Sequence, residues 1–325
     1  MRFIVTIDTE EDDWGSYHKT GHTLRNIERI PYVQNIFDKY DVKPTYLITY
    51  PVATDIRACS ILKDILDEGR CEIGSHCHPW NTPPFEEENN EYNSMLCNLP
   101  PALQYRKLEA LHSEIVKAFK SEPTSFRAGR WGFSKSVAEN ILKLGYKVDS
   151  SITPFCDWSD YYGPDFSEAP TQPTFLINHN CSSTGLDEGL IEIPATVGFL
   201  QKNFSFCNKL LKKLKSKALR PFRIIGILYQ LKLLNLIWLS PELNNGKEMQ
   251  HLSSTCKKLG YLFLNMMFHS TSLMPGQSPF VQNQSDLETF ITDIESLLGF
   301  ASANGMCFTS LSEAGEIYRK ISAQK

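Results

Sequence analysis

The chain has 325 residues, 42% of them hydrophobic and 22% charged, which is typical of a globular protein and excludes a disordered or repetitive one. A formal net charge of −4 gives no reason to expect a nucleic-acid partner. No apolar run reaches the roughly 18 residues that cross a bilayer, and an acid at Asp8 leaves the first apolar run too short for a secretion signal. Nine cysteines without a CxxC pair favour reduced thiols, so we expect a cytoplasmic protein.

The first element is predicted to be a buried parallel strand over residues 2–7, because these residues are apolar on both faces. A run of acids follows it. Asp8 and Glu10 lie two residues apart, so they point to the same side of an extended backbone, and we interpret them as part of a site. For the acids at 11–13 we favour a solvated loop, since each buried carboxylate would need a partner.

Helical and strand patterns then alternate along the chain. Apolar residues at helical spacing predict helices over residues 27–37, 61–66, 103–119, 136–144 and 287–301. Strands are predicted over residues 43–49, 71–78, 125–132, 146–149, 259–268 and 306–309. This alternation indicates a parallel sheet, and we find no linker that divides it, so we expect one domain over residues 1–325.

Two histidines stand at the end of the strand in residues 71–80, which read CEIGSHCHPW. His76 and His78 are two residues apart, so both imidazoles can face one ion in an extended backbone. Zinc, iron or cobalt would accept this pair together with a carboxylate. The alternative is two polar residues in a loop, with Pro79 marking the turn.

Other polar residues also stand at strand ends, where parallel sheets gather their functional groups. They come from five separate strands and are Asp8, His76, His78, Arg127, Asp149 and His269. Such a coincidence indicates a common site.

Residues 193–241 depart from the pattern, because they contain nine lysines and arginines and no acid. Apolar residues interleave with these charges over residues 202–238. Such a basic amphipathic segment can make peripheral contact with an anionic membrane or bind a phosphate-bearing ligand. The alternative, which we favour, is a helical insertion over about residues 200–245 whose apolar side packs on the rest of the protein.

Five motifs, in this order, resemble the polysaccharide deacetylase family with the NodB homology domain, also known as carbohydrate esterase family 4. They are TIDTE at residues 6–10, EIGSHCHP at 72–79, FRAGRWG at 126–132, VDS at 148–150 and MFHS at 267–270. The resemblance covers nearly the whole chain outside the basic insertion and is greatest to a divergent branch found with lipopolysaccharide and O-antigen genes. It implies an α/β fold, a distorted (β/α) barrel of about seven parallel strands.

The resemblance also implies a chemistry, the removal of an acyl group from an N-acylated sugar with one divalent metal. We expect zinc, with cobalt, iron, nickel or manganese as alternatives. By resemblance, Glu10, His76 and His78 hold the metal. Asp8 is the catalytic base, which Arg127 orients, and His269 is the general acid. These roles fit the residues, because a metal polarises a carbonyl, a carboxylate takes a proton from water and an imidazolium protonates a leaving nitrogen.

Two departures from the family pattern leave alternatives open. The two acids of the first motif are usually adjacent, but Thr9 separates them here, so Asp8 is a further possible metal ligand. The second histidine usually comes four residues after the first, where this chain has Trp80, so His78 must replace it.

Five residues complete the predicted site as substrate-binding groups. Trp80 and Trp131 offer faces on which a sugar can lie, although a place in the core is equally compatible with them. Asp149 resembles the family's fourth motif, and Arg130 and Glu192 stand at strand ends.

The preferred function is therefore a metal-dependent hydrolase acting on a sugar of a surface polysaccharide or its precursor, which could be lipid- or nucleotide-linked. One alternative keeps the metal but acts on a non-sugar amide or ureide. Another is a non-catalytic barrel that binds carbohydrate or membrane.

Overall fold

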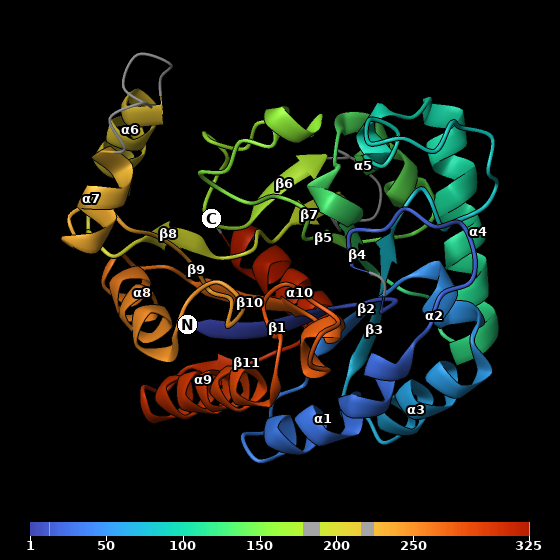
Figure 1. The fold of residues 1–325 in the computed structure, drawn as a ribbon, viewed down its shortest axis with the longest axis horizontal. Coiled ribbons are helices and arrows are strands. Elements are labelled where there is room, and N and C mark those ends of the chain that lie inside the picture. The colour runs from blue at the N-terminus through green and yellow to red at the C-terminus, as the bar shows by residue number, and fades with distance from the viewer. Residues whose placement is uncertain (13, 178–188, 216–223, 325) are drawn as a thin grey trace.

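A mostly parallel sheet forms the centre of the computed structural model, which describes residues 1–12, 14–177, 189–215 and 224–324 (Figure 1). Its strands are β1 (Arg2–Thr9), β2 (Thr45–Ile48), β3 (Glu72–Cys77), β4 (Ser125–Ala128), β5 (Val148–Asp149), β6 (Thr174–Ile177), β7 (Leu190–Glu192), β10 (Phe263–His269) and β11 (Cys307–Phe308). The helices packed around it are α1 (Ile30–Asp38), α2 (Tyr50–Thr54), α3 (Ile56–Asp67), α4 (Pro101–Phe119), α5 (Lys135–Lys143), α8 (Gly246–Lys258), α9 (Gln284–Ala303) and α10 (Leu311–Ser322). None of the helices in these ranges is long and apolar enough to cross a membrane.

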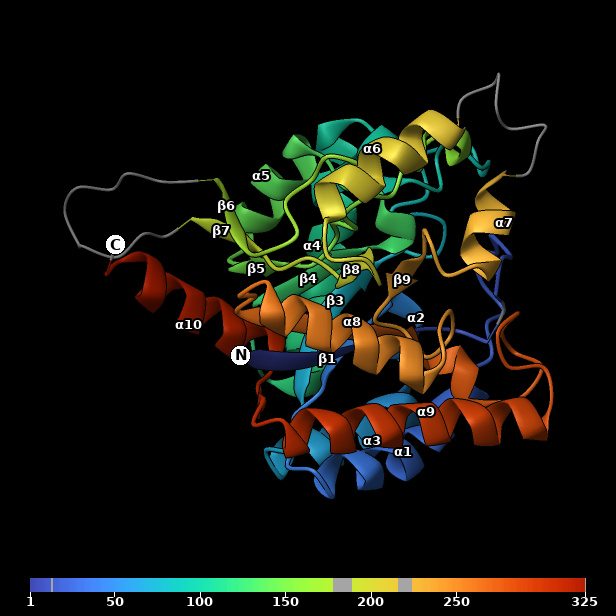
Figure 2. The same ribbon diagram turned by 90° about the vertical axis from the view of Figure 1, so that its left-hand side faces the viewer.

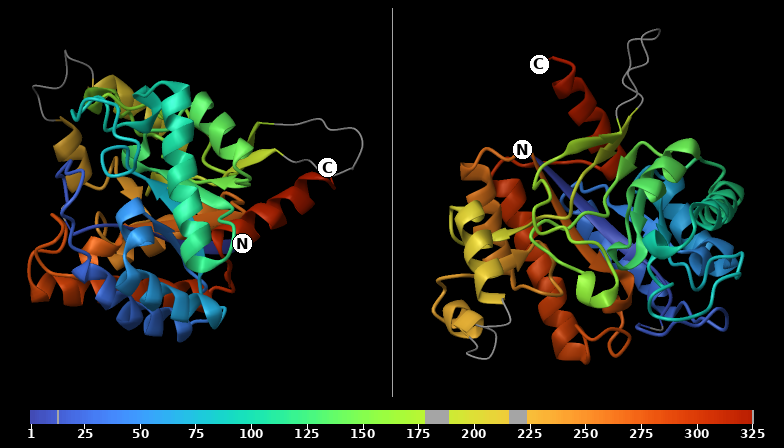
Figure 3. Two further views of the ribbon diagram at one scale, coloured as in Figure 1. Left: turned by 90° about the vertical axis from the view of Figure 1, so that its right-hand side faces the viewer. Right: turned by 90° about the horizontal axis from the view of Figure 1, so that it is seen from above.

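The strands follow the order β10-β1-β2-β3-β4-β5-β7-β6, and β11 pairs with β1. Every neighbouring pair from β10 to β7 is parallel, whereas β6 runs antiparallel to β7. Among the described strands no pairing joins β6 back to β10, so the curled sheet forms an open barrel (Figure 3). The predicted distorted barrel of about seven parallel strands is confirmed.

Alternate residues of β1 serve two sides of this sheet. Phe3, Val5 and Ile7 join the large core between the sheet and the helices. Ile4 packs inside the barrel with residues of other strands. Because successive side chains alternate, Thr6, Asp8 and the following Glu10 share the inner side with Ile4. The strand thus carries its acids into the barrel mouth.

The helices begin and end where capping residues place them. Asp55 accepts a hydrogen bond from the backbone of α3, and Ser134 does the same for α5. Gly69 and Gly145, with φ of +73° and +91°, follow the ends of α3 and α5, where glycine adopts the left-handed conformation at little cost.

The last parallel strand is shorter than predicted. β10 begins at Phe263, whereas residues 246–258 form α8, which the sequence reading did not include. Leu259 is the C-cap of that helix, and Gly260, with φ of +79°, turns the chain towards the strand. The continuous run of apolar residues concealed this boundary.

The basic segment forms α6 (Phe204–Lys215), α7 (Ile224–Gln230) and a short strand, β9 (Leu236–Trp238). β9 pairs antiparallel with β8 (Val197–Phe199) in a separate two-stranded sheet. The expected insertion is therefore helical in part and extended at residues 236–238. Lys217, Arg220 and Arg223 lie outside the described residues.

Register brings three pairs of polar residues together where the parallel strands end. Asp8 on β1 is level with His269 on β10, and His76 on β3 is level with Arg127 on β4. Asp149 on β5 is level with Glu192 on β7. The sheet itself therefore assembles the site that the sequence predicted at this edge.

Candidate active site

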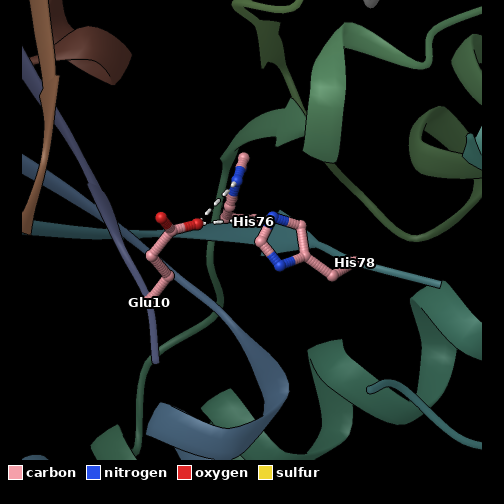
Figure 4. Close-up of side chains that lie close together, drawn as sticks. All are labelled: Glu10, His76 and His78. Atoms are coloured by element: carbon pink, nitrogen blue, oxygen red, sulfur yellow. Dashed lines mark ion pairs between the residues drawn. The ribbon is translucent and has the colours of Figure 1, made fainter. Parts of the chain in front are cut away.

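Glu10, His76 and His78 converge at the mouth of the barrel (Figure 4). One oxygen and two nitrogens of these side chains lie within 4.8 Å of one another. Glu10 Oε2 is 3.5 Å from His78 Nε2 and 4.0 Å from His76 Nε2. All three residues are buried, and they form the one such group of potential metal ligands in the described residues.

These donors fit a divalent metal. Two imidazoles and one carboxylate are a ligand set that leaves coordination positions open on zinc and similar ions. Burial lowers the pKa of His76 to about 3, so this ring is neutral at pH 7. Its Nδ1 lies 3.1 Å from the Arg127 carbonyl, which leaves Nε2 turned towards Glu10. Burial raises the pKa of Glu10 to about 7, although the charges of His269 and His78 act to lower it.

The ring of His78 is held from three sides. Its Nδ1 lies 3.4 Å from Glu11 Oε1, and the Trp80 ring stacks on it with centroids 4.2 Å apart and planes 21° apart. Gly129 lies against the third side, where a Cβ would overlap the imidazole. His78 can therefore take the ligand position that the family places two residues later.

The expectation of a solvated loop is wrong for Glu11. It is buried, and besides His78 it accepts hydrogen bonds from Asn81 Nδ2 at 2.6 Å and Thr49 Oγ1 at 3.1 Å. Burial opposes its ionisation, but the hydrogen bond and charge of His78 outweigh burial and lower the pKa of Glu11 to about 2. Glu11 thus fixes the orientation of the His78 ring.

Asp12 is buried as well, so the same expectation is wrong there. Its carboxylate accepts hydrogen bonds from Thr23 Oγ1, from Asn26 Nδ2 and from the Arg25 backbone, at 2.7 to 2.9 Å. These bonds tie the acidic run to the short helical turn at Arg25–Arg29. Asp13 lies outside the described residues.

Asp8 shares a side with Glu10 but has different partners. Its Oδ1 accepts a hydrogen bond from Arg127 Nη1 at 2.6 Å, and its Oδ2 lies 3.7 Å from His269 Nε2 and 4.0 Å from His76 Nε2. Burial would raise the pKa of Asp8, but the charge and hydrogen bond of Arg127, together with the charge of His269, outweigh it and lower the pKa below its ordinary value. Asp8 is therefore ionised at neutral pH.

Arg127 is fully buried, and its guanidinium donates hydrogen bonds to several groups around it. Besides Asp8 it donates to the Ser150 carbonyl at 2.8 Å, to Ser150 Oγ at 3.0 Å and to Thr6 Oγ1 at 2.8 Å. These fixed bonds hold the carboxylate of Asp8 in one orientation.

His269 stands on the other side of Asp8. Glu242 binds it twice, because Oε2 lies 2.9 Å from His269 Nδ1 and Oε1 accepts from the His269 backbone at 2.9 Å. Burial would lower the pKa of His269, but the charge and hydrogen bond of Glu242 outweigh it and raise the pKa to about 9. His269 is thus protonated at pH 7, with Nε2 directed at Asp8.

Asp149 and Glu192 are fully buried beside the turn at residues 150–152. Asp149 binds Ser151, and Glu192 Oε1 accepts from the Ile152 backbone at 3.0 Å. Burial raises the pKa of both groups. Neither side chain has appreciable exposed surface, so this placement favours a role in holding the 150–152 turn over the predicted substrate contact.

The other three predicted substrate residues lie nearer the mouth. Trp80 is buried against His78, and its Nε1 has no hydrogen-bond partner. Trp131 is half-buried over Arg127, with its ring 5.9 Å from that of Trp238. Arg130 stacks over Tyr17 at 5.4 Å. Aromatic rings therefore lie beside His78 and Arg127, and we call Trp80, Trp131 and Trp238 the aromatic rim.

Two residues of the site were missed by the sequence reading, Glu11 and Glu242. Glu11 was lost in a run of acids whose members have different environments. Glu242 carried a usable signal, because it is the first acid after the acid-free residues 193–241.

The comparisons with known proteins agree with this geometry. Residues 20–148 match the model of a family described as polysaccharide deacetylase, and this range contains His76, His78 and Arg127. A comparison with curated proteins gives no match.

Solved structures share the fold over nearly the whole chain. A proposed glycoside hydrolase/deacetylase from Parabacteroides distasonis has a TM-score of 0.57 at 12% identity, covering 98% of this chain and 71% of that one. A proposed polysaccharide deacetylase from Mycobacterium smegmatis has a TM-score of 0.53 at 13% identity, covering 98% and 91%. An allantoinase has a TM-score of 0.52 at 9% identity, covering 97% and 88%. The predicted resemblance to the polysaccharide deacetylase family is confirmed over residues 20–148, which match the model of that family directly.

Proposed function

We propose that this protein is a metal-dependent hydrolase that removes an N-acyl group, such as acetyl, from a sugar of a surface polysaccharide or its precursor. The observation that carries the proposal is the position of Asp8, which lies between Arg127 and His269 and beside the Glu10, His76 and His78 group. A base, an acid and a metal-ligand set are the parts that amide hydrolysis needs.

Glu10, His76 and His78 would hold the ion, for which we propose zinc, with cobalt, iron, nickel or manganese as alternatives. A divalent ion there would polarise the carbonyl oxygen and acidify water. Asp8 accepts the proton of the attacking water, because Arg127 keeps it ionised. His269 donates its Nε2 proton to the nitrogen as the C–N bond breaks, so that a carboxylate and an amine leave.

We propose a lipid- or nucleotide-linked sugar as substrate, in line with the branch of the family that the motifs suggest. The aromatic rim supports a sugar, because the rings of Trp131 and Trp238 lie 5.9 Å apart and the Trp131 ring contacts Arg127, the partner of Asp8. We place the reaction in the cytoplasm, which agrees with the eight free cysteines of the described residues.

The test is hydrolysis of N-acetylated sugars and their nucleotide-linked forms by purified, metal-loaded protein, measured as acetate release. His76→Ala is expected to abolish release while the far-ultraviolet circular dichroism spectrum persists. Release undiminished in that variant would refute the proposed site.

A second candidate is hydrolysis of a non-sugar amide or ureide. It is favoured by the shared fold with an allantoinase and by the same catalytic groups, which do not themselves require a sugar. Linear amides and ureides assayed beside the sugars distinguish the two, since only one class should be hydrolysed efficiently.

A third candidate is a non-catalytic barrel. It would follow if purified protein bound no divalent ion, as measured by metal analysis, with His76 and His78 intact.

A further inference from the structure

A cluster of exposed apolar side chains lies at α7 and the turn that follows it (Figures 1 and 2). Ile227, Leu231 and Leu233 are 55%, 62% and 59% exposed, and Tyr229 is exposed beside them. We name these four residues the apolar tip. Fifteen large hydrophobic residues are exposed in the described part of the chain, and four of them fall within seven residues here, so this exposure is concentrated.

Hydrogen bonds within the turn and to a neighbouring part of the chain fix the backbone of the apolar tip. The Tyr229 carbonyl accepts bonds from the Lys232 backbone at 3.0 Å and from Asn235 Nδ2 at 2.9 Å. Gln201 Nε2 donates to the Lys232 carbonyl at 2.8 Å. Leu234, next in the chain, is buried, so the tip side chains cannot turn inwards without displacing it.

Positive charge lies within the apolar tip's own turn and on the neighbouring helix α6. Lys232 belongs to the same turn, and α6, which contacts α7, exposes Lys209, Lys213 and Lys215. Lys212 is partly neutralised, because its Nζ lies 2.9 Å from Glu168. Residues 193–241 contain no Asp or Glu, so the segment has no negative charge of its own to offset these lysines.

The two helices of the segment behave differently. α6 buries Phe204, Cys207, Leu211 and Leu214 against the rest of the protein, as expected for a packed insertion. The apolar tip has no such cover among the described residues. A packed insertion with solvated lysines therefore accounts for α6 and not for the tip.

We propose that the apolar tip and the α6 lysines dock on a bilayer containing anionic phospholipid. Apolar side chains enter the boundary between headgroups and acyl chains, and flanking lysines contact the phosphates. Nucleic acid would bind the lysines but leave the leucines exposed to water. A bilayer with anionic headgroups contacts both the lysines and the apolar side chains, so we favour it as the partner.

The docking surface adjoins the candidate site. α7 lies at the end of the molecule towards which β1 runs, the end that carries Asp8 and His269 (Figure 2). β9 leads from the tip to Trp238 on the aromatic rim, and Glu242 follows four residues later. A protein docked in this way presents its catalytic groups close to the membrane surface.

Vesicle flotation of the full chain tests the proposal and is independent of catalysis, because no substrate is present. The protein is expected to float with vesicles of phosphatidylcholine and phosphatidylglycerol and to remain below with phosphatidylcholine alone. Leu231→Ser with Leu233→Ser should weaken flotation without changing charge. Replacing Lys209, Lys213 and Lys215 by Ser should weaken it about fivefold for each lysine.

A matched control replaces three exposed lysines of other helices, Lys117, Lys135 and Lys143, by Ser and should float like the wild type. The substituted side chains are exposed, so all variants should unfold at the wild-type temperature. Flotation that is unaffected by the leucine changes but abolished by the lysine changes would indicate a phosphate-bearing ligand and overturn the proposal. A protein that does not float with either kind of vesicle would also overturn it, and this includes the case in which a dimer covers the tip.

Discussion

Asp8 and His269 face each other from neighbouring parallel strands, with Oδ2 and Nε2 3.7 Å apart. Each has a charged partner of opposite sign, Arg127 for Asp8 and Glu242 for His269. These partners move the two pKa values apart, below the ordinary value for Asp8 and to about 9 for His269. A base that is ionised and an acid that is protonated at the same pH are thus built into two adjacent strands.

The first prediction is that Asp8→Asn reduces amide hydrolysis about 10²–10⁴-fold, the usual contribution of a positioned general base. Asparagine keeps the shape but cannot take a proton from water. The measurement is kcat on an N-acetylated sugar by metal-loaded protein. Metal content should stay unchanged, because Glu10, His76 and His78 remain.

Asp8→Asn also leaves Arg127 without its anion, so its stability must be followed by thermal unfolding. His269→Gln serves as the second variant, since it removes the acid and keeps the Asp8–Arg127 pair. Wild-type rates in both folded variants would contradict the assignment of base and acid.

The second prediction concerns Glu242→Gln and the alkaline limb of kcat/KM. His269 must be protonated to act as the acid, and Glu242 raises its pKa to about 9, so activity should fall as pH rises through about 9. Without the carboxylate the limb should move towards the ordinary value of about 6.5. The free energy of unfolding should depend on pH in the same direction as activity. The stabilisation by the His269–Glu242 pair is complete below about pH 6.5 and is lost as pH rises through 9.

Ser272→Ala provides the control, because Ser272 donates to the same carboxylate without touching His269. Its alkaline limb should stay within a few tenths of a pH unit of the wild type. An unmoved limb in Glu242→Gln would show that Glu242 does not hold the proton on His269.

The third prediction is that metal affinity depends on pH through Glu10. Burial raises the pKa of this ligand to about 7, so below that pH the ion must displace a proton. Affinity for zinc should therefore fall by up to about tenfold for each pH unit below 7. Calorimetry in buffers of different ionisation enthalpy should detect the released proton, and Glu10→Gln should release fewer protons.

Much of this site follows from sequence because parallel strands end at one edge. The spacing of Asp8 and Glu10, and of His76 and His78, correctly predicted a shared face, since alternation is a property of any extended strand. Arg127 and His269 followed from the same rule. The strand register then placed Asp8 level with His269 and His76 level with Arg127.

The other residues of the candidate site could not be predicted from the sequence, because their roles depend on burial and on the paths of loops. Glu11 and Asp12 look like solvated acids, and only the fold shows that one binds His78 and the other caps a turn. Glu242 reaches His269 from a loop 27 residues earlier in the chain. Asp149 and Glu192 stand at strand ends like Asp8 and His269, yet the following turn covers them.

The last prediction is that Glu11→Gln weakens zinc binding about 10–100-fold, the usual effect of losing a group that orients a metal-ligating histidine. Glu11 holds His78 Nδ1 at 3.4 Å and keeps a pKa of about 2, so it is ionised throughout the working range. Glutamine keeps one oxygen that accepts from Asn81, and its amide nitrogen can donate to Thr49 Oγ1 instead of accepting from it. The charge that makes the His78 ring a stronger donor to metal is removed. Competition with a zinc chelator measures the affinity.

Glu86→Gln, the same change at an exposed position paired with Arg106, should leave zinc affinity unchanged. His78→Ala sets the scale, because it removes the ligand itself. If Glu11→Gln binds zinc like the wild type while His78→Ala does not, Glu11 only stabilises the loop. If both bind like the wild type, the metal lies outside the Glu10, His76 and His78 group, and the ligand set is wrong.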